Sequence, residues 1–279
     1  MQKFSCIKEK KQRQLKDNQL LNIAIQAALK AGDVIMEVYN SDDFEVESKS
    51  DDSPLTKADK QANDVINSFL LTTNIPIISE ENKQIAYQER KNWNRCWVVD
   101  PVDGTKEFIK RNGEFTVNIA LVQDELPLLG VIYVPVTKEL YFSDVSTQES
   151  FKTIINNSSI SIDEIFSNAK LLTGSVDTNL IQVVGSRSHM SQETLDYVNE
   201  LKKSGKEVEI VSKGSSLKFC LVADGKADVY PRFAPTMEWD TAAGQAICNA
   251  IGIDVISSET NEMLRYNKEN LLNPWFIVK

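Results

Sequence analysis

Acidic residues that follow short apolar runs or open a predicted helix are the side chains best suited to chemistry in this sequence. They form three groups: Glu80 with Glu81, Asp100 with Asp103, and Asp240. Carboxylates at strand ends converge on the edge of a sheet, and Mg²⁺ prefers oxygen ligands that leave room for water and phosphate. Since two such ions about 3.5–4 Å apart can clamp both oxygens of an in-line displacement, these acids predict a metal site that acts on a phosphate ester.

The run Asp-Pro-Val-Asp-Gly-Thr at 100–105 combines two kinds of group in consecutive positions. Asp100 and Asp103 stand three apart across a turn, so two carboxylates and the Val102 carbonyl can face one site. Gly104 and Thr105 follow at the start of a predicted helical turn, whose free backbone N–H groups bind phosphate. A single Glu-Glu or Asp-x-x-Asp pair is commonly a solvated turn. Metal ligands directly beside a phosphate-binding turn are harder to explain as ordinary surface residues.

The charge balance limits what this protein can bind. The formal net charge is −9, which argues against a nucleic-acid polymer as ligand because a phosphate backbone requires a basic face. The same charge would repel a small phosphorylated substrate unless cations lie between protein and phosphate. A composition of 42% hydrophobic and 25% charged residues is that of an ordinary globular protein.

Two amphipathic helices are expected ahead of the acidic groups. Apolar residues recur at helical spacing over 19–39, where Asp17 or Asn18 can cap the helix, and over 56–71. A short strand is expected over 44–49, where apolar and polar residues alternate. The apolar faces of both helices indicate core packing.

The rest of the chain divides into an α+β part and an α/β part. Short strands are expected in the first part, over 75–78, 96–99, 115–122, 128–134 and 139–144. In the second part strands alternate with helices: strands over 181–185, 208–211 and 228–231, and helices over 192–203, 215–223 and 238–250. We predict three regions: an N-terminal extension over 1–18, a metal and phosphatase subdomain over 19–150, and a specificity subdomain over 151–279.

The N-terminal residues and the cysteines carry little functional signal. Residues 1–18 are polar and Lys-rich with no apolar core, so they predict an extension ahead of the fold rather than a secretory signal. No apolar run approaches the roughly 18 residues of a membrane span. No Cys-x-x-Cys spacing occurs, and reduced thiols and a cytoplasmic location are the default. The cysteines are Cys6, Cys96, Cys220 and Cys248.

Three segments resemble, in order, the signatures of the inositol monophosphatase superfamily: Ser79-Glu-Glu81, 97–105 and 239–244. Further segments are similar to bacterial 3′(2′),5′-bisphosphate nucleotidases of the CysQ type: 104–121, 186–189, 214–222 and 230–233. The resemblance covers the chain from about residue 20 onwards and is weak over 151–179. It implies the layered αβαβα sandwich of the sugar phosphatase fold.

The resemblance also implies the metal ligands. A first Mg²⁺ would bind Glu80, Asp100 and the Val102 carbonyl, and a second would share Asp100 and add Asp103 and Asp240. Both sets consist of oxygen ligands, as Mg²⁺ requires. No signature position departs from the family pattern, so the sequence gives no sign of an inactive enzyme.

Catalytic and substrate-binding roles follow from the same resemblance. Thr105, oriented by Asp59, would help a metal-activated water attack in line, and Glu81 would assist through a third ion or a water. The nucleotide is expected to contact residues from both halves: Gly104, Thr105, Lys106, His189, Ser215, Lys218, Arg232 and Asp240. Among these, Ser215, Lys218 and Arg232 would hold the phosphate that is not cleaved.

The implied activity is hydrolysis of adenosine 3′,5′-bisphosphate to AMP and phosphate in support of sulfur assimilation. The sulfated nucleotide with a 3′-phosphate and the 2′,5′ isomer remain alternative substrates, as do inositol monophosphate and fructose 1,6-bisphosphate. A nucleotide-sensing protein without turnover is the alternative from another class. The family implies a cytoplasmic enzyme that can associate peripherally with the inner membrane. The oligomeric state and the residues that contact adenine stay open.

Overall fold

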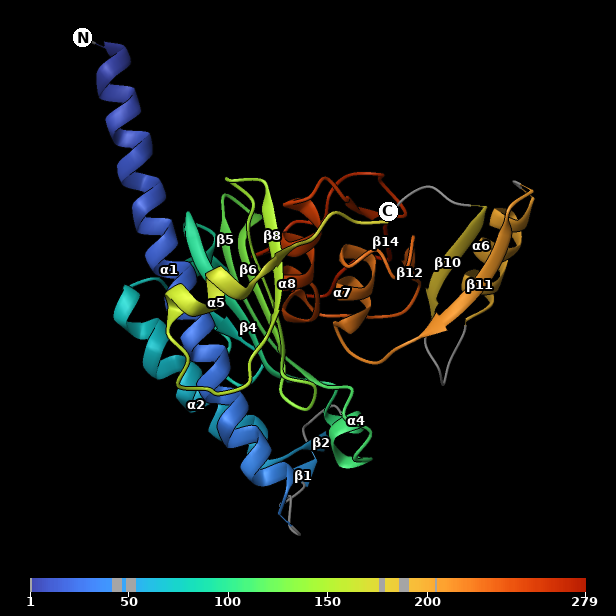
Figure 1. Cartoon of the computed structure of the whole chain (residues 1–279), viewed down its shortest axis with the longest axis horizontal. Coiled ribbons are helices and arrows are strands. Elements are labelled where there is room, and N and C mark those ends of the chain that lie inside the picture. Colours follow the sequence, from blue (N-terminus) through green and yellow to red (C-terminus); the bar gives the residue numbers. More distant parts are fainter. Residues whose placement is uncertain (1, 42–46, 49–53, 176–178, 186–190, 204) are drawn as a thin grey trace.

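Two helices cover one face of a seven-stranded sheet, and further helices and a second group of strands cover the other (Figure 1). This computed structural model describes all residues except 1, 42–46, 49–53, 176–178, 186–190 and 204. For 2–16, 47–48 and 54–55 it describes the backbone alone. His189 and the Ser-Arg-Ser-His segment predicted from sequence therefore lie outside the described residues.

The covering helices are α1 (Gln2–Tyr39) and α2 (Lys57–Leu70). Helix α2 begins where the sequence predicts, with Thr56 as its N-cap. The predicted start of α1 is wrong, because the helix runs from Gln2 through Asp17 without interruption. Residues 2–18 contain neither Pro nor Gly, so no residue breaks the helix there. Asp17 forms an ion pair with Arg95 at 2.9 Å instead of capping.

The main sheet has the strand order β3-β4-β5-β6-β7-β8-β9. Its strands are β3 (Ile77–Ser79), β4 (Arg95–Asp103), β5 (Thr116–Gln123), β6 (Leu126–Val134), β7 (Glu139–Asp144), β8 (Glu149–Ile154) and β9 (Lys170–Leu171). Strands β3 and β4 are parallel, and the other neighbours are antiparallel. The predicted hairpin between β5 and β6 is confirmed, with positive φ at Asp124 and Glu125 in its turn.

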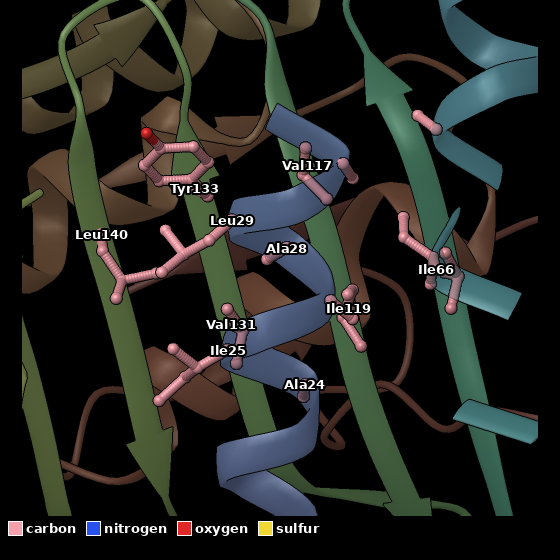
Figure 2. Close-up of a cluster of buried hydrophobic side chains, with 14 of the residues drawn as sticks. Ala24, Ile25, Ala28, Leu29, Ile66, Val117, Ile119, Val131, Tyr133 and Leu140 are labelled. Atoms are coloured by element: carbon pink, nitrogen blue, oxygen red, sulfur yellow. The ribbon is translucent and has the colours of Figure 1, made fainter. Parts of the chain in front are cut away.

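Small and branched side chains bring α1 close to the sheet (Figure 2). Ala24, Ile25, Ala28 and Leu29 of α1 belong to one buried cluster with Val117, Ile119, Val131 and Tyr133 of β5 and β6. A Cβ on Gly32 would overlap with the Tyr133 ring. Helix α1 can therefore contact β6 at this point only because residue 32 has no side chain.

The opposite face of the main sheet packs against α7 (Leu217–Ala223) and α8 (Glu238–Asn249). The contact is close, because a Cβ on Gly130 of β6 would lie 2.6 Å from the Ala243 carbonyl oxygen of α8. Buried side chains of β4 to β7 and of both helices form one apolar cluster. The two halves predicted from sequence thus share a core across this face.

A second group of strands lies beyond α7 and α8. It consists of β12 (Tyr230–Arg232), β14 (Phe276–Val278) and β13 (Val255–Ser257) in one sheet, and the parallel pair β10 (Leu180–Gly185) and β11 (Glu207–Ser212). A bridge between Val183 and Val229 joins the two sets, and α6 (Gln192–Lys202) lies outside them (Figure 1). The order of layers is α/β/α/β/α, which confirms the predicted sandwich.

The remaining elements are short: β1 (Glu47–Ser48), β2 (Pro54–Leu55), η1 (Leu71–Thr73), α3 (Tyr87–Arg90), α4 (Thr105–Ile109) and α5 (Ile162–Asn168). Of the predicted strand over 44–49, only Glu47–Ser48 is described as a strand. Strands β8 and β9 extend the main sheet past residue 150, and the division into subdomains stays a prediction. Among the described residues, no helix combines the length and apolar character needed to cross a membrane.

Candidate active site

Three carboxylates meet where the end of β4 faces the start of α8. Asp100 and Asp103 come from β4 and Asp240 from the first turn of α8, and each offers an oxygen within 4.8 Å of the others. Within the described residues, neither Glu80 nor Glu81 is part of this close set. The structure thus brings together three of the predicted acids from segments more than 130 positions apart.

A bulge in β4 lets both of its aspartates take part in the acidic cluster. In a regular strand, residues three positions apart point to opposite faces. The pairing of β4 with β5 shifts register between Asp100 and Asp103, and the Val102 N–H donates to Asp100 Oδ1 at 3.0 Å. Such a bulge redirects side chains at the end of a strand. Two carboxylates from one short segment therefore reach the same point.

The parallel pairing of β3 with β4 places Glu80 beside this bulge. Ser79 is paired with Val99, and the Glu80 N–H donates to the Val99 carbonyl at 3.1 Å. Glu80 therefore follows β3 at the level where Asp100 follows Val99. Its negative charge is close enough to raise the pKa of Asp100.

The start of α8 orients Asp240. The Met237 N–H donates to Asp240 Oδ2 at 2.8 Å, so Asp240 caps its own helix as the third residue of a capping box. A carboxylate in the first turn is also favoured by the helix dipole. Because a carboxylate has two oxygens, this bond leaves one oxygen available to the acidic cluster.

Burial and mutual repulsion disfavour the ionised forms of the three aspartates. Burial raises the pKa of Asp100 well above 3.8, and the charges of Glu80 and Asp103 raise it further. Burial raises the pKa of Asp240 to about 8, with Asp103 adding to the shift. A divalent cation between the carboxylates would offset this cost, and an all-oxygen donor set fits a hard cation such as Mg²⁺. The residues present therefore fit a metal site.

Thr105 and Asp59 connect α4 to α2 at the edge of the cluster. The Thr105 hydroxyl lies 3.2 Å from Asp59 Oδ1 and 3.3 Å from the Val102 carbonyl oxygen. Asp59 is buried, and its Oδ2 accepts hydrogen bonds from the Thr56 N–H at 2.8 Å and the Thr56 hydroxyl at 2.5 Å. The capping residues of α2 thus hold the carboxylate that faces Thr105.

Helix α4 begins at a glycine that no other residue can replace without strain. Gly104 has φ +95°, and a Cβ there would lie 3.0 Å from the Glu114 carbonyl oxygen and 3.2 Å from Ser215 Cβ. The absence of a side chain lets the chain turn sharply from β4 into α4. Lys106, in the first turn of α4, has an exposed side chain.

The sequence model of the inositol monophosphatase family matches residues 16–274. The chain belongs to the inositol monophosphatase family. It is 43% identical over 262 residues to the 3′(2′),5′-bisphosphate nucleotidase CysQ of Salmonella typhimurium, covering 93% of this chain and 99% of that protein. The corresponding CysQ protein of Escherichia coli strain K12 is 42% identical over the same length and coverage.

Solved structures of this family share the fold. The crystal structure of CysQ from Bacteroides thetaiotaomicron aligns with a TM-score of 0.84 and 50% identity, covering 94% of this chain and 97% of that one. Inositol monophosphatase II from Staphylococcus aureus aligns with a TM-score of 0.69 at 19% identity, covering 94% and 91%. The second likeness concerns the fold alone.

The predicted phosphate ligands of this family member lie next to the acids. Ser215, which has φ +46°, precedes α7, and its carbonyl accepts a hydrogen bond from Lys218 Nζ at 2.7 Å. Burial lowers the pKa of Lys218 to about 8, although Asp103 raises it. Arg232 donates from Nη2 to the Pro235 carbonyl at 3.3 Å, and its buried Nε has no partner among the described residues.

Sequence reasoning missed the polar residues that hold Asp103. The Ser216 N–H donates to Asp103 Oδ2 at 2.5 Å, and Asn118 Nδ2 lies 3.5 Å from the same oxygen. Asn118 Oδ1 accepts from the hydroxyls of Ser216 at 2.7 Å and Thr116 at 3.0 Å. The signal that could have found Thr116 and Asn118 is that two polar residues alternate at the start of a mainly apolar strand, where the structure buries both fully.

A second missed group fixes the loop that carries Glu80 and Glu81. The Ser79 hydroxyl donates to Asn63 Oδ1 at 2.8 Å. Asn82 Oδ1 accepts from Asn63 Nδ2 at 2.9 Å, and from Asn67 Nδ2 at 3.0 Å. Asparagines one turn apart on α2 therefore bracket the two glutamates with hydrogen bonds, which restricts where the glutamates can lie.

Proposed function

We propose that this protein is a magnesium-dependent 3′(2′),5′-bisphosphate nucleotidase that converts adenosine 3′,5′-bisphosphate to AMP and phosphate. The observation that carries the proposal is the cluster of Asp100, Asp103 and Asp240 next to the basic residues Lys218 and Arg232. A bisphosphate needs one anion site where bond cleavage occurs and a second for the phosphate that stays. The CysQ proteins of Salmonella typhimurium and Escherichia coli carry this activity in their names.

Two Mg²⁺ ions are proposed, with a third at Glu81 as an extension of the site. The first ion takes Glu80, Asp100 and the Val102 carbonyl, and the second takes Asp100, Asp103 and Asp240. When bound, the ions supply positive charge for the phosphoryl oxygens and lower the pKa of water. The mutual repulsion of the carboxylates supports this assignment, because cations between them would favour their ionised forms.

Thr105 and Asp59 are proposed to orient the attacking water. An ionised carboxylate only accepts hydrogen bonds, so the Thr105 hydroxyl donates a hydrogen bond to Asp59 Oδ1 at 3.2 Å. The lone pairs of the Thr105 oxygen then face away from Asp59 and can accept a hydrogen bond from water. This bond restrains the water's direction of approach to phosphorus.

The start of α4 is proposed to hold the phosphoryl group that is cleaved from the substrate. Backbone N–H groups at Gly104 and Thr105 can donate to its oxygens as negative charge develops there. Lys106, which is exposed in the same turn, adds a positive charge there. The sharp turn at Gly104 supports this role, since it begins α4 directly after the strand that carries Asp100 and Asp103.

The phosphate that is not cleaved is proposed to bind Ser215, Lys218 and Arg232, with His189 as a further contact to the nucleotide. The planar guanidinium of Arg232 can donate two parallel hydrogen bonds to one phosphate, whereas Lys218 provides a point charge. The unpartnered buried Nε of Arg232 supports this assignment, because a buried donor without an acceptor is costly. We place the reaction in the cytoplasm, in support of sulfur assimilation.

The test is phosphate release from adenosine 3′,5′-bisphosphate, inositol 1-phosphate and fructose 1,6-bisphosphate, each with and without Mg²⁺. We expect magnesium-dependent turnover with a strong preference for the nucleotide, lost in Asp100→Asn. Preference for another phosphate would leave the acids in place but overturn the assigned nucleotide ligands. Turnover of none of the substrates would favour a sensor. The sulfated nucleotide and the 2′,5′ isomer are measured in the same assay.

A further inference from the structure

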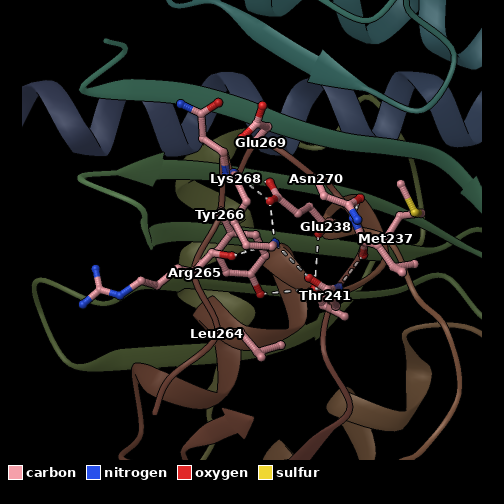
Figure 3. A network of polar contacts seen from close by, with 12 residues as sticks. Met237, Glu238, Thr241, Leu264, Arg265, Tyr266, Lys268, Glu269 and Asn270 are labelled. Atoms are coloured by element: carbon pink, nitrogen blue, oxygen red, sulfur yellow. Dashed lines mark hydrogen bonds and ion pairs between the residues drawn. The ribbon is translucent and has the colours of Figure 1, made fainter. Parts of the chain in front are cut away.

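A buried carboxylate that takes no part in the proposed chemistry stands two residues before Asp240. Glu238 is fully buried in the first turn of α8. Its Oε2 accepts from the Asn267 N–H at 2.6 Å, and its Oε1 accepts from the Lys268 N–H at 3.0 Å and Lys268 Nζ at 2.6 Å (Figure 3). Both oxygens therefore face donors only.

Lys268 is matched to this carboxylate in charge and in hydrogen bonding. Besides Glu238, its ammonium donates to the Arg265 carbonyl at 3.0 Å and lies 3.4 Å from Asn273 Oδ1. Three acceptors thus surround the three protons of the ammonium. Removing one member of such a pair leaves an uncompensated charge in a buried place, which is strongly destabilising.

The segment 265–273 that carries Lys268 also holds the backbone at the start of α8. The Glu238 N–H donates to the Leu271 carbonyl at 2.9 Å. Asn273 donates from its backbone N–H to the Thr236 carbonyl at 2.8 Å and from Nδ2 to the Met237 carbonyl at 2.7 Å. Because Met237 is the residue whose N–H orients Asp240, segment 265–273 fixes the position of this carboxylate.

Arg90 ties the same segment to the part of the chain that follows Glu80. Its Nη1 donates to Asn267 Oδ1 at 2.9 Å and to the Lys268 carbonyl at 2.7 Å, and it is buried. Its Nε donates to the Ile85 carbonyl at 3.1 Å. One connected set of hydrogen bonds thus runs from the loop after β3 to the start of α8.

We propose that Glu238, Lys268 and Arg90 are positioning residues that set the affinity of the acidic cluster for divalent cations. They hold the start of α8, and with it Asp240, at a fixed distance from the loop that carries Glu80. A metal site responds to sub-ångström changes in its ligands, and residues that orient ligands affect binding nearly as much as the ligands themselves. This inference rests on the metal site of the proposed function and not on the identity of the substrate.

The test compares Lys268→Met with Lys152→Met in the full-length protein. Lys152 is a matched control: it pairs with Glu139 at 2.7 Å and Asp224 at 2.9 Å, and it lies over the Tyr141 ring as Lys268 lies over Tyr266. Isothermal titration with Mn²⁺ without substrate gives Kd, and thermal unfolding gives Tm. We expect both variants to lose stability, but only Lys268→Met to bind Mn²⁺ about tenfold or more weakly.

Two further variants keep the inference falsifiable if Lys268→Met does not fold. Glu238→Gln places an amide NH₂ against a hydrogen-bond donor. Arg90→Lys keeps the positive charge but loses the guanidinium group that donates to several acceptors. Both variants should weaken Mn²⁺ binding. Lys268→Arg should recover part of the affinity. Wild-type affinity in Glu238→Gln and Arg90→Lys, or equal weakening in Lys152→Met, would overturn the inference and leave the nucleotidase standing. Wild-type Mn²⁺ affinity in Asp240→Asn would instead show that Asp240 is not a metal ligand. It would overturn the metal site on which the inference and the proposed function both depend.

Discussion

Two opposing requirements act on each aspartate of the acidic cluster. Chemistry needs them ionised, whereas burial and mutual repulsion raise the pKa of Asp100 and Asp240. A cation resolves the conflict, since it favours the ionised form of every ligand that surrounds it. The stability of the protein should therefore depend on pH and on metal together.

At the residue scale, the raised pKa of Asp240 predicts a pH-dependent loss of stability in the metal-free protein. A carboxyl with a raised folded pKa binds more protons in the folded state than in the unfolded state, so stability falls as pH rises. For Asp240 the fall extends from its ordinary 3.8 to about 8. Thermal unfolding in chelator across this range should show the fall, and Asp240→Asn should reduce it. A Tm that rises with pH throughout this range would contradict the assignment.

A second prediction at this scale concerns Arg232, whose buried Nε has no partner among the described residues. Arg232→Ala should raise KM for adenosine 3′,5′-bisphosphate about 10- to 150-fold, because a hydrogen bond to a charged group contributes about 1.5–3 kcal/mol. Hydrolysis of simple monophosphates should be spared. Arg265→Ala is the control, since Arg265 is an exposed arginine paired with Glu125. Equal loss on bisphosphate and monophosphate would show that Arg232 does not bind the second phosphate.

At the element scale, β6 is held between α1 on one face and α8 on the other. Gly32 on α1 permits the first contact and Gly130 on β6 permits the second. The two contacts are similar in closeness but differ in function, because only α8 carries a residue of the acidic cluster. Substitutions at the two glycines can therefore separate an effect on core packing from an effect on the position of Asp240.

We predict that Gly32→Ala and Gly130→Ala both destabilise the protein, by about 1–3 kcal/mol each, since an added methyl overpacks the core. Only Gly130→Ala should also weaken divalent-metal binding, because a Cβ there meets the Ala243 carbonyl at 2.6 Å and pushes α8 from the sheet. Urea unfolding and Mn²⁺ titration measure the two effects. Weaker metal binding in Gly32→Ala to the same degree would indicate a general loss of structure instead.

Local patterns allowed the elements around the motifs to be predicted, because each pattern lies within a few residues. The start of α2, predicted at about residue 56, and strand β4, predicted over 96–99, are of this kind. The start of α1 was missed, since Asp17 has the type of a cap but bonds to Arg95, which is distant in sequence. Strand β14 was missed because it has only three residues, too few for a period to appear.

For the candidate site, sequence predicted the residue types but not the contacts that hold them. The bond from Ser216 to Asp103 joins residues more than 100 positions apart, and the bond from Asn267 to Glu238 is also non-local. No single-sequence pattern reports such contacts. The resemblance to a family supplied Asp59 as a partner for Thr105, which the residues alone did not indicate.

At the scale of the whole molecule, the proposed metal site predicts that metal binding and folding are linked. The proposed ligands come from both halves of the chain, so only the folded protein assembles them. A ligand that binds only the folded state stabilises it by about 2.7 kcal/mol at a concentration 100 times its Kd. The net charge of −9 adds to this dependence, because bound cations reduce self-repulsion.

Mg²⁺ at saturating concentration should therefore raise Tm by about 5–10 °C in a protein of this size, and chelator should reverse the rise. Asp100→Asn removes a ligand shared by both proposed ions and should abolish most of the shift. Differential scanning calorimetry with and without Mg²⁺ measures it. Since a general salt effect would also act through net charge, an equal shift with Na⁺ at matched ionic strength would argue against a specific site.

The position of β14 within its sheet has a consequence for how this protein folds. It lies between β12 and β13 in its sheet, yet it follows every other described element along the chain. Until residues 276–278 join this sheet, β12 and β13 therefore each keep an unpaired edge. Exposed edges of this kind invite pairing with other chains. A chain in which β14 has not yet joined the sheet is thus prone to aggregation, and any premature stop ahead of this strand leaves a sheet without its middle.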